Sequence, residues 1–275
     1  MYGQTRVFAL FAPRKEKMEE PDKILNIIID DKKAAIKSGT TILNAARRAG
    51  IDIPTLCYHP ALEPYGVCRV CIVEIKRGKR TRVVTSCNYP IQDDGLEIFT
   101  NSERIKRDRK MVIELLLARC WSSKVIREFA AKYGITDTEL QKTENEECIL
   151  CGLCVNVCRD LIGQSAIGFE SRGVDRKTSV PFRKPNDACI GCGACVYVCP
   201  TGCIKLEDLP EERVIERWRS EIPVLVCKSC GRGFGTVKQL EVLKNKNPLA
   251  KFYLEKCPKC REKELAEVMV RKGGF

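Results

Sequence analysis

The sequence predicts an α+β protein in which three cysteine-rich parts follow one another along the chain. Three observations predict it. Residues 23–100 carry strand and helix patterns around four spaced cysteines, residues 148–206 carry the spacing C-x2-C-x2-C-x3-C twice, and residues 222–275 carry two C-x2-C pairs. The other stretches lack such patterns, and we expect an N-terminal arm, a helical linker and a second linker at 1–22, 101–147 and 207–221.

The composition limits the classes of function. Most of the eighteen cysteines fall into groups, so metal sites are expected to replace part of the apolar core. The formal net charge of +12 would attract nucleic acid, an anionic membrane or an acidic partner, and does not choose among them. The single histidine, His59, leaves few acid–base or mixed metal sites. No apolar run is long enough to cross a bilayer and no signal peptide is visible, so we expect a soluble, cytoplasmic protein.

The first cysteine-rich part opens with a predicted hairpin. Residues 24–29 are rich in β-branched side chains, Asp30 and Asp31 mark a turn, and residues 34–36 are apolar again. A helix is expected next in ILNAARRAG, with a threonine cap before it and Gly50 as its stop. Hairpin, helix and cysteine-bearing loop are the order expected of a β-grasp domain.

Four cysteines of this domain have the spacing C-x10-C-x2-C-x15-C, and they are Cys57, Cys68, Cys71 and Cys87. A two-iron cluster needs four thiolates, and a long loop can close over it with backbone N–H groups aimed at the sulfurs. Gly66 is placed to let the backbone come close. The spacing therefore predicts a plant-type [2Fe–2S] ferredoxin domain, with a zinc site as the alternative.

Residues 101–135 are expected to be helical, with Ser102 as the N-cap and Gly134 as a stop. Cys120 lies in this helical linker, and we expect it to be a buried apolar thiol and not a ligand.

The repeated spacing predicts two [4Fe–4S] clusters in a bacterial-type ferredoxin domain. Three thiolates at steps of three, with a fourth shortly after, let a short loop wrap most of one cube. Zinc sites take separated pairs of ligands, and disulfides do not suit a chain without a signal peptide, so both alternatives fit less well. The two sets are Cys148, Cys151, Cys154 and Cys158, then Cys189, Cys192, Cys195 and Cys199.

The C-terminal part predicts a small metal ribbon. Residues 207–221 are charged and prone to form helix, and read as a linker. The two pairs beyond it give C-x2-C-x26-C-x2-C, and four thiolates make a closed tetrahedral site for zinc, with rubredoxin-like iron or a further [4Fe–4S] cluster as alternatives. The four residues are Cys227, Cys230, Cys257 and Cys260. The GRGFG segment at 231–235 follows a knuckle and is not expected to bind a nucleotide.

The segment TLCYHPALEPYGVCRVCIVEI resembles the N-terminal [2Fe–2S] domain of the large iron–sulfur subunit of respiratory complex I, of iron-only hydrogenases, and of related subunits of NAD-linked formate dehydrogenases and [NiFe]-hydrogenases. The segments CILCGLCVNVC and CIGCGACVYVCPTG resemble the two-cluster module of the same family. The resemblance implies that Cys57, Cys68, Cys71 and Cys87 are ligands, and that His59 shapes the loop without ligating. The family's additional histidine-ligated cluster should be absent, because residues 101–147 contain no histidine.

The resemblance also implies that the fourth cysteine of each repeat crosses to the other cluster. Cys199 then joins Cys148, Cys151 and Cys154, while Cys158 joins the second repeat. Cys203 is expected to be a small buried residue and not a ligand.

No dinucleotide fingerprint, P-loop or flavin signature appears in the chain, and neither do the catalytic motifs of hydrogenases. The hypothesis is an electron-transfer subunit of a multi-subunit NAD(P)-linked oxidoreductase, with a hydrogenase first and a formate dehydrogenase second. Electron bifurcation comes from the resemblance alone. The expected partners are a flavin or NAD(P)-binding subunit, a catalytic subunit and ferredoxin. A free polyferredoxin carrier and a nucleic-acid enzyme subunit are the alternatives. Under the preferred hypothesis, nucleic acid is not among the expected partners.

Overall fold

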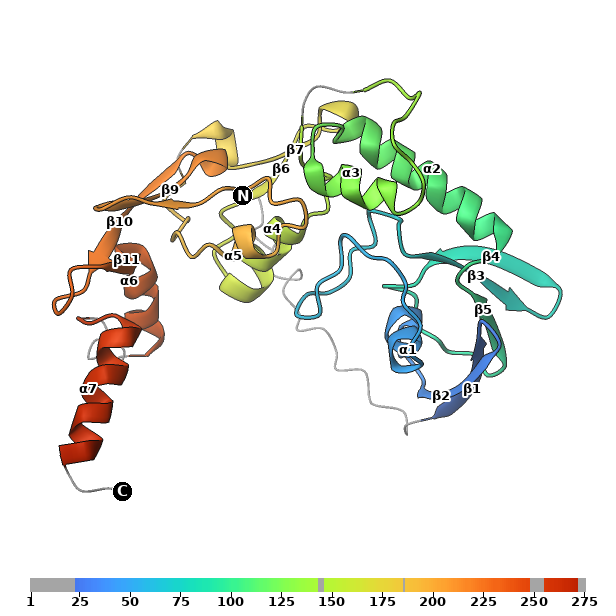
Figure 1. The fold of residues 1–275 in the computed structure, drawn as a ribbon, viewed down its shortest axis with the longest axis horizontal. Coiled ribbons are helices and arrows are strands. Elements are labelled where there is room, and N and C mark those ends of the chain that lie inside the picture. The colour runs from blue at the N-terminus through green and yellow to red at the C-terminus, as the bar shows by residue number, and fades with distance from the viewer. Residues whose placement is uncertain (1–22, 143–145, 185, 248–254, 272–275) are drawn as a thin grey trace, which may run out of the picture.

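The computed structural model describes residues 23–142, 146–184, 186–247 and 255–271. Its parts form a row (Figure 1), with the first sheet at one end, the repeated cysteine motifs in the middle, and the last strands and helices at the other end. The expected N-terminal arm, 1–22, lies outside the described residues.

The first sheet has the strand order β2-β1-β5-β3-β4. Strands β1 and β5 run parallel, and the other neighbours are antiparallel. In β1, Leu25, Ile27 and Ile29 are buried while Ile24 is exposed, the alternation that a strand with one covered face requires. The strands are β1 (Ile24–Ile29), β2 (Lys32–Lys37), β3 (Ile72–Arg77), β4 (Arg80–Thr85) and β5 (Leu96–Phe99).

The predicted hairpin and the helix after it are confirmed. Strands β1 and β2 pair across the turn at Asp30 and Asp31, and α1 (Ile42–Arg48) follows. The Thr41 hydroxyl accepts a hydrogen bond from the backbone N–H of Asn44, and Gly50 ends this segment at a φ of 68°. The buried face of α1 packs on the core of the sheet.

Two helices form the predicted helical linker, α2 (Glu103–Arg119) and α3 (Lys124–Ala131). Ser102 caps α2 by accepting a hydrogen bond from the N–H of Ile105 at 3.3 Å, as its position predicts. Apolar side chains of both helices share one core with Val70 from the first cysteine loop and with Leu153 from the repeated motif. This core joins the first two cysteine-rich parts.

The repeated motif folds into short, related elements. Each repeat places a left-handed glycine before a one-turn helix: Gly152 before α4 (Leu153–Asn156) and Gly193 before α5 (Ala194–Tyr197). Between them lie a π-helical turn, a two-stranded sheet and two 3-10 turns, which are η2 (Val157–Ile162), β6 (Gly168–Glu170), β7 (Lys177–Ser179), η3 (Gly173–Asp175) and η4 (Pro181–Arg183).

The helical character expected for residues 207–221 is wrong. This segment forms β8 (Glu207–Asp208), β9 (Glu212–Ile215) and the 3-10 turn η5 (Glu216–Trp218), and then enters β10. Burial of Ile215 and Ile222 on one face of an antiparallel sheet outweighs the local helix preference of the charged residues. The sheet order is β11-β10-β9-β8, with β10 (Ser220–Val226) and β11 (Gly233–Thr236).

Two helices complete the described chain, α6 (Val237–Lys246) and α7 (Pro258–Arg271). Thr236 and Gln239 form a reciprocal capping box at the start of α6. No helix in the described ranges is long and apolar enough to cross a membrane.

Candidate metal centres

Four buried cysteines of the first domain lie close together: Cys57, Cys68 and Cys71 in the first cysteine loop, between α1 and β3, and Cys87 just after β4. Hydrogen bonding with the Cys68 thiol, and with the backbone N–H groups of residues 66–68, lowers the pKa of Cys57 to about 6. Hydrogen bonding with Cys87 likewise lowers the pKa of Cys71 to about 6. A site with four buried sulfurs and backbone N–H groups aimed at one of them fits an iron–sulfur cluster. All eighteen cysteines lie in the described ranges, and each has a free thiol.

Gly66 allows the close approach of this loop. Its φ is 70°, and a Cβ atom there would lie 2.6 Å from the Asn88 side chain. His59 also belongs to the loop: its Nδ1 accepts a hydrogen bond from the N–H of Ala61, and its ring stands edge-on to Tyr197.

The fourth cysteine of each repeat lies near cysteines of the other repeat. Burial raises the pKa of Cys154, and the charges of Cys151, Cys148, Cys195 and Cys199 raise it further. Burial also raises the pKa of Cys158, where the neighbouring charges are those of Cys192 and Cys189. The charge of Cys199 also acts on the Cys151 thiol. These neighbours agree with crossed ligand sets, in which Cys199 joins the first repeat and Cys158 joins the second.

Cys203 is the residue whose placement differs from expectation. Its side chain is partly exposed instead of buried, and its sulfur lies 3.6 Å from that of Cys199. Hydrogen bonding with Cys203 lowers the pKa of Cys199 to about 5 and that of Cys148 to about 6. Five thiols therefore surround the first of the two centres.

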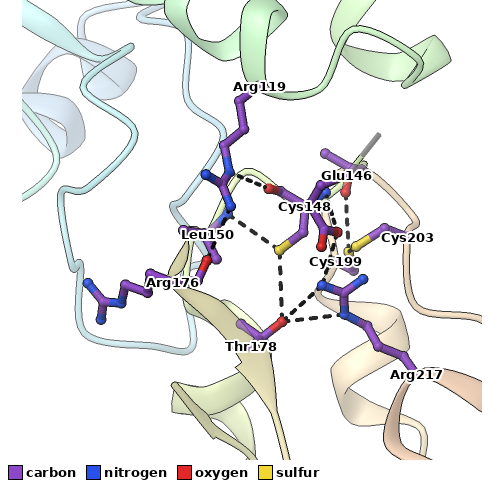
Figure 2. Close-up of polar contacts among 10 residues, drawn as sticks. Arg119, Glu146, Cys148, Leu150, Arg176, Thr178, Cys199, Cys203 and Arg217 are labelled. Carbon is purple, nitrogen blue, oxygen red and sulfur yellow. Dashed lines mark hydrogen bonds and ion pairs between the residues drawn. The ribbon is translucent and has the colours of Figure 1, made fainter. Parts of the chain in front are cut away.

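A polar network surrounds the Cys148 sulfur (Figure 2). The N–H of Leu150 donates to this sulfur at 3.4 Å, and the Thr178 hydroxyl lies 3.9 Å from it. Arg217 donates to the Thr178 hydroxyl and pairs with Glu146, with 3.0 Å between Nη2 and Oε1. Backbone is held as well, because Arg119 donates to the carbonyl of Cys148 at 3.1 Å.

The second centre has a different donor. The indole Nε1 of Trp218 lies 3.3 Å from the Cys195 sulfur, and Trp218 is completely buried. The backbone N–H of Ala166 donates to the Cys158 sulfur, also at 3.3 Å. Sequence reasoning missed both Arg217 and Trp218. The one available signal was a tryptophan inside the charged run ERWRSE, which indicates a buried anchor.

The three sulfur sets follow one another in space. Cys57 and Cys68 share a packed core with Cys151, and the charge of Cys57 acts on the Cys151 thiol. The two repeats are in contact as well, because Cys154 and Cys195 belong to one packed core. The order is therefore the Cys57 set, the Cys148 set and the Cys189 set.

The four C-terminal cysteines also converge, with their sulfurs all within 4.8 Å of one another. The Cys227 sulfur accepts a hydrogen bond from the N–H of Cys257 at 3.2 Å, which contributes to lowering its pKa to about 6. A backbone hydrogen bond from Lys228 to Glu255 ties the two knuckles together. Four thiols at this spacing fit a tetrahedral metal ion.

The remaining cysteine outside these sets, Cys120, is fully buried at the end of α2, and burial raises the pKa of its thiol to about 12. Its expected character as a buried thiol is confirmed. The GRGFG segment directly follows the first knuckle, where the N–H of Gly231 donates to the carbonyl of Cys227, and it continues into the first residues of β11.

Comparison with known proteins identifies two domains. Residues 22–103 match the 2Fe-2S iron-sulfur cluster binding domain, and residues 141–206 match the 4Fe-4S dicluster domain. The NADH-ubiquinone oxidoreductase 75 kDa subunit of Reclinomonas americana is 31% identical over 185 residues, covering 58% of this chain and 26% of the relative. The NADPH-Fe(3+) oxidoreductase subunit alpha of Geobacter sulfurreducens is 32% identical over 177 residues, covering 54% of this chain and 20% of the relative.

A solved structure adds a third relative. One chain of the NAD+-reducing [NiFe]-hydrogenase in the H2-reduced state matches with a TM-score of 0.50 and 28% identity, over 57% of this chain and 75% of that chain. Against the two curated relatives above, the match spans only a fifth to about a quarter of their length. The chain is therefore an iron–sulfur protein with a 2Fe-2S cluster binding domain and a 4Fe-4S dicluster domain, homologous to parts of oxidoreductase subunits that include the complex I 75 kDa subunit.

Proposed function

We propose that this chain is the electron-transfer subunit of a multi-subunit NAD(P)-linked oxidoreductase. It relays single electrons between a flavin or NAD(P)-binding subunit and a catalytic metal subunit or ferredoxin. The observation that carries the proposal is the row of three sulfur sets, in which Cys57 shares a packed core with Cys151, and Cys154 shares one with Cys195. Iron–sulfur clusters held in such a row exchange one electron at a time.

The proposed ligands of the [2Fe–2S] cluster are Cys57, Cys68, Cys71 and Cys87. Each of the two [4Fe–4S] clusters takes three thiolates from one repeat and the fourth from the other, with Cys199 in the first set and Cys158 in the second. The protein's own contribution is to bury the sulfurs, to aim backbone N–H groups at them, and to fix their order. The tail set of Cys227, Cys230, Cys257 and Cys260 is assigned to zinc, because two knuckles and four thiols make a closed site.

The finer fold assignments belong to the same proposal. The mixed sheet crossed by α1 supports a β-grasp domain, and the paired repeats support a bacterial-type ferredoxin fold. The domain boundaries of the first two parts are kept at 23–100 and 148–206. Because β8 and β9 pair with β10, we assign 207–221 to the same unit as the metal ribbon instead of to a linker.

The hydrogenase assignment rests on the structural match to a chain of the NAD+-reducing [NiFe]-hydrogenase, of which three quarters is covered. A formate dehydrogenase is the second candidate, and electron bifurcation rests only on family resemblance. Reduced thiol ligands suit a reducing compartment, so we place the protein in the cytoplasm. A free carrier has no need for the separate metal ribbon, and a nucleic-acid enzyme has no need for the [2Fe–2S] domain.

Metal content of the intact chain tests the cluster assignment. The preferred set contains about 10 iron atoms and one zinc, whereas a cubane in the tail would give about 14 iron atoms and no zinc. A content near roughly 6 iron atoms, one cubane short, would overturn the three-cluster assignment.

Purification under native conditions tests the partner assignment. Stable association with flavin-bearing and hydrogenase or dehydrogenase subunits supports the proposal. A monodisperse lone chain would indicate the free carrier, and salt-sensitive DNA binding would indicate the nucleic-acid enzyme.

A further inference from the structure

Two consecutive residues of the 3-10 turn η5 contact the two halves of the dicluster region. Arg217 belongs to the network around the Cys148 sulfur, and Trp218 donates its indole N–H to the Cys195 sulfur. Both residues lie beyond residue 206, where the match to the 4Fe-4S dicluster domain ends. The C-terminal sheet therefore supplies polar groups to centres whose cysteines all come from earlier in the chain.

The Trp218 hydrogen bond is well defined. Trp218 is 0% exposed, and the indole N–H is a donor that needs a partner when it is buried. The partner is the Cys195 sulfur at 3.3 Å. A hydrogen bond to a ligand sulfur stabilises negative charge there, so it favours the reduced state of the centre that the sulfur serves.

Arg217 acts on the other centre and acts less directly. Its guanidinium donates to the Thr178 hydroxyl, which in turn lies 3.9 Å from the Cys148 sulfur. The side chain is 19% exposed, so water screens its positive charge only in part. Glu146 pairs with the same guanidinium and offsets some of that charge. We therefore expect Arg217 to change the reduction potential of its centre less than the Trp218 hydrogen bond changes that of the other centre.

The sheet also holds the loop that carries the second repeat. Arg213 of β9 donates to the carbonyl of Gly191 at 2.8 Å, and the Thr236 hydroxyl donates to the carbonyl of Ile190 at 2.5 Å. A Cβ atom at Gly191 would lie 2.9 Å from Thr236 and 3.0 Å from Ile222, so sheet and loop are in close contact. Residues 190 and 191 lie between Cys189 and Cys192, so η5 is held in a fixed position against the sulfurs.

We propose that the sheet β8–β11 is a tuning element for the two [4Fe–4S] centres. Trp218 raises the reduction potential of the centre held by Cys189, Cys192, Cys195 and Cys158, while Arg217 raises that of the Cys148 centre. Trp218 and Arg217 are positioning residues, because each acts on its centre through a ligand sulfur. Reduction adds one electron to a centre and breaks no bond to the protein. The inference rests on the cluster assignment of the proposed function.

The test is a redox titration of the full chain, followed by electron paramagnetic resonance. Trp218→Phe removes the donor and keeps an aromatic ring, so one cubane should become about tenfold harder to reduce, a shift of about 59 mV for a one-electron couple. The other cubane should keep its potential. Arg217→Gln should lower the potential of that other cubane instead, by a smaller amount. Arg219→Gln is the matched control, because Arg219 donates to the carbonyl of Arg183 and carries the same charge two residues away.

A spectroscopic measurement that leaves Trp218 in place keeps the test valid if Trp218→Phe fails to fold. The chain has only two tryptophans, so labelling indole nitrogen with 15N gives few signals. Electron–nuclear double resonance of one reduced cubane should show a 15N coupling that survives Trp121→Phe. No such coupling, or equal potentials in Trp218→Phe and the unaltered chain with both cubanes present, overturns the inference. Missing cubane iron in the unaltered chain would instead overturn the proposed function.

Discussion

Arg109 provides the sharpest test of how the first cysteine loop is held. Its side chain is 3% exposed, and it reaches from α2 to three backbone carbonyls. Nε donates to Val70 at 3.1 Å, and Nη2 donates to Ile72 at 2.8 Å and to Thr100 at 3.1 Å. Residues 70 and 72 flank Cys71, so this one guanidinium fixes the backbone on both sides of a proposed ligand.

The cost of Arg109→Met follows from these contacts. Each buried carbonyl that loses its donor costs about 1–3 kcal/mol. Burying the charged guanidinium carries a penalty, and that penalty lowers the pKa of Arg109. Methionine fills much of the same volume and removes this penalty. Setting these effects against each other, we expect a net loss of about 3 kcal/mol of unfolding free energy.

Urea unfolding measures this loss. With a slope of about 1–3 kcal/mol/M, the midpoint should fall by roughly 1–3 M, and the visible absorbance of the two-iron cluster should be lost in the same transition. Arg107→Met is the matched control on the same helix, because the Arg107 side chain is 77% exposed and pairs only weakly with Asp108. If Arg109→Met and Arg107→Met unfold within about 1 kcal/mol of each other, the guanidinium does not hold the loop.

Three further predictions follow from the described sites. Cys120→Ser should leave the iron content unchanged, and a loss of iron would make Cys120 a ligand. In the unaltered protein this thiol should resist iodoacetamide near pH 8, because burial raises its pKa to about 12. Gly66→Ala should lower stability by about 1–3 kcal/mol in thermal unfolding, because the backbone there has a φ of 70° and the new Cβ would meet Asn88. Gly78→Ala is the control for positive φ alone, because its new Cβ meets no atom within 4 Å. Cys227→Ser should release the tail metal and leave the iron content intact; a parallel loss of iron would place a cluster in the tail.

Much of the site could be predicted because its information is local. Sequence spacing places Cys148, Cys151 and Cys154 within seven residues that end in the first turn of α4. Local sequence likewise sets the turn at Asp30 and the cap at Ser102. Such features depend on backbone geometry over a few residues. Their structural counterparts appear at the expected places.

Other features depend on contacts between distant segments. Residues 207–221 become strands because β10 offers a partner and an apolar face, and no local pattern reveals that choice. Trp218 lies 23 residues from Cys195 in sequence, and only the turn between β9 and β10 brings the indole to the sulfur. The position of Cys203 beside Cys199 could have been suspected, because Cys203 follows Cys199 by four positions, just after the second repeat.

The shared core between the first two sulfur sets has a consequence for kinetics. Cys57, Cys68 and Cys151 belong to one packed cluster together with Val70 and Leu153. Protein interiors are packed as densely as organic crystals, so close-packed side chains fix the distance between these sulfurs, which no flexible linker could do. Every molecule then has the same gap, and electron transfer across it would follow a single exponential instead of a spread of rates.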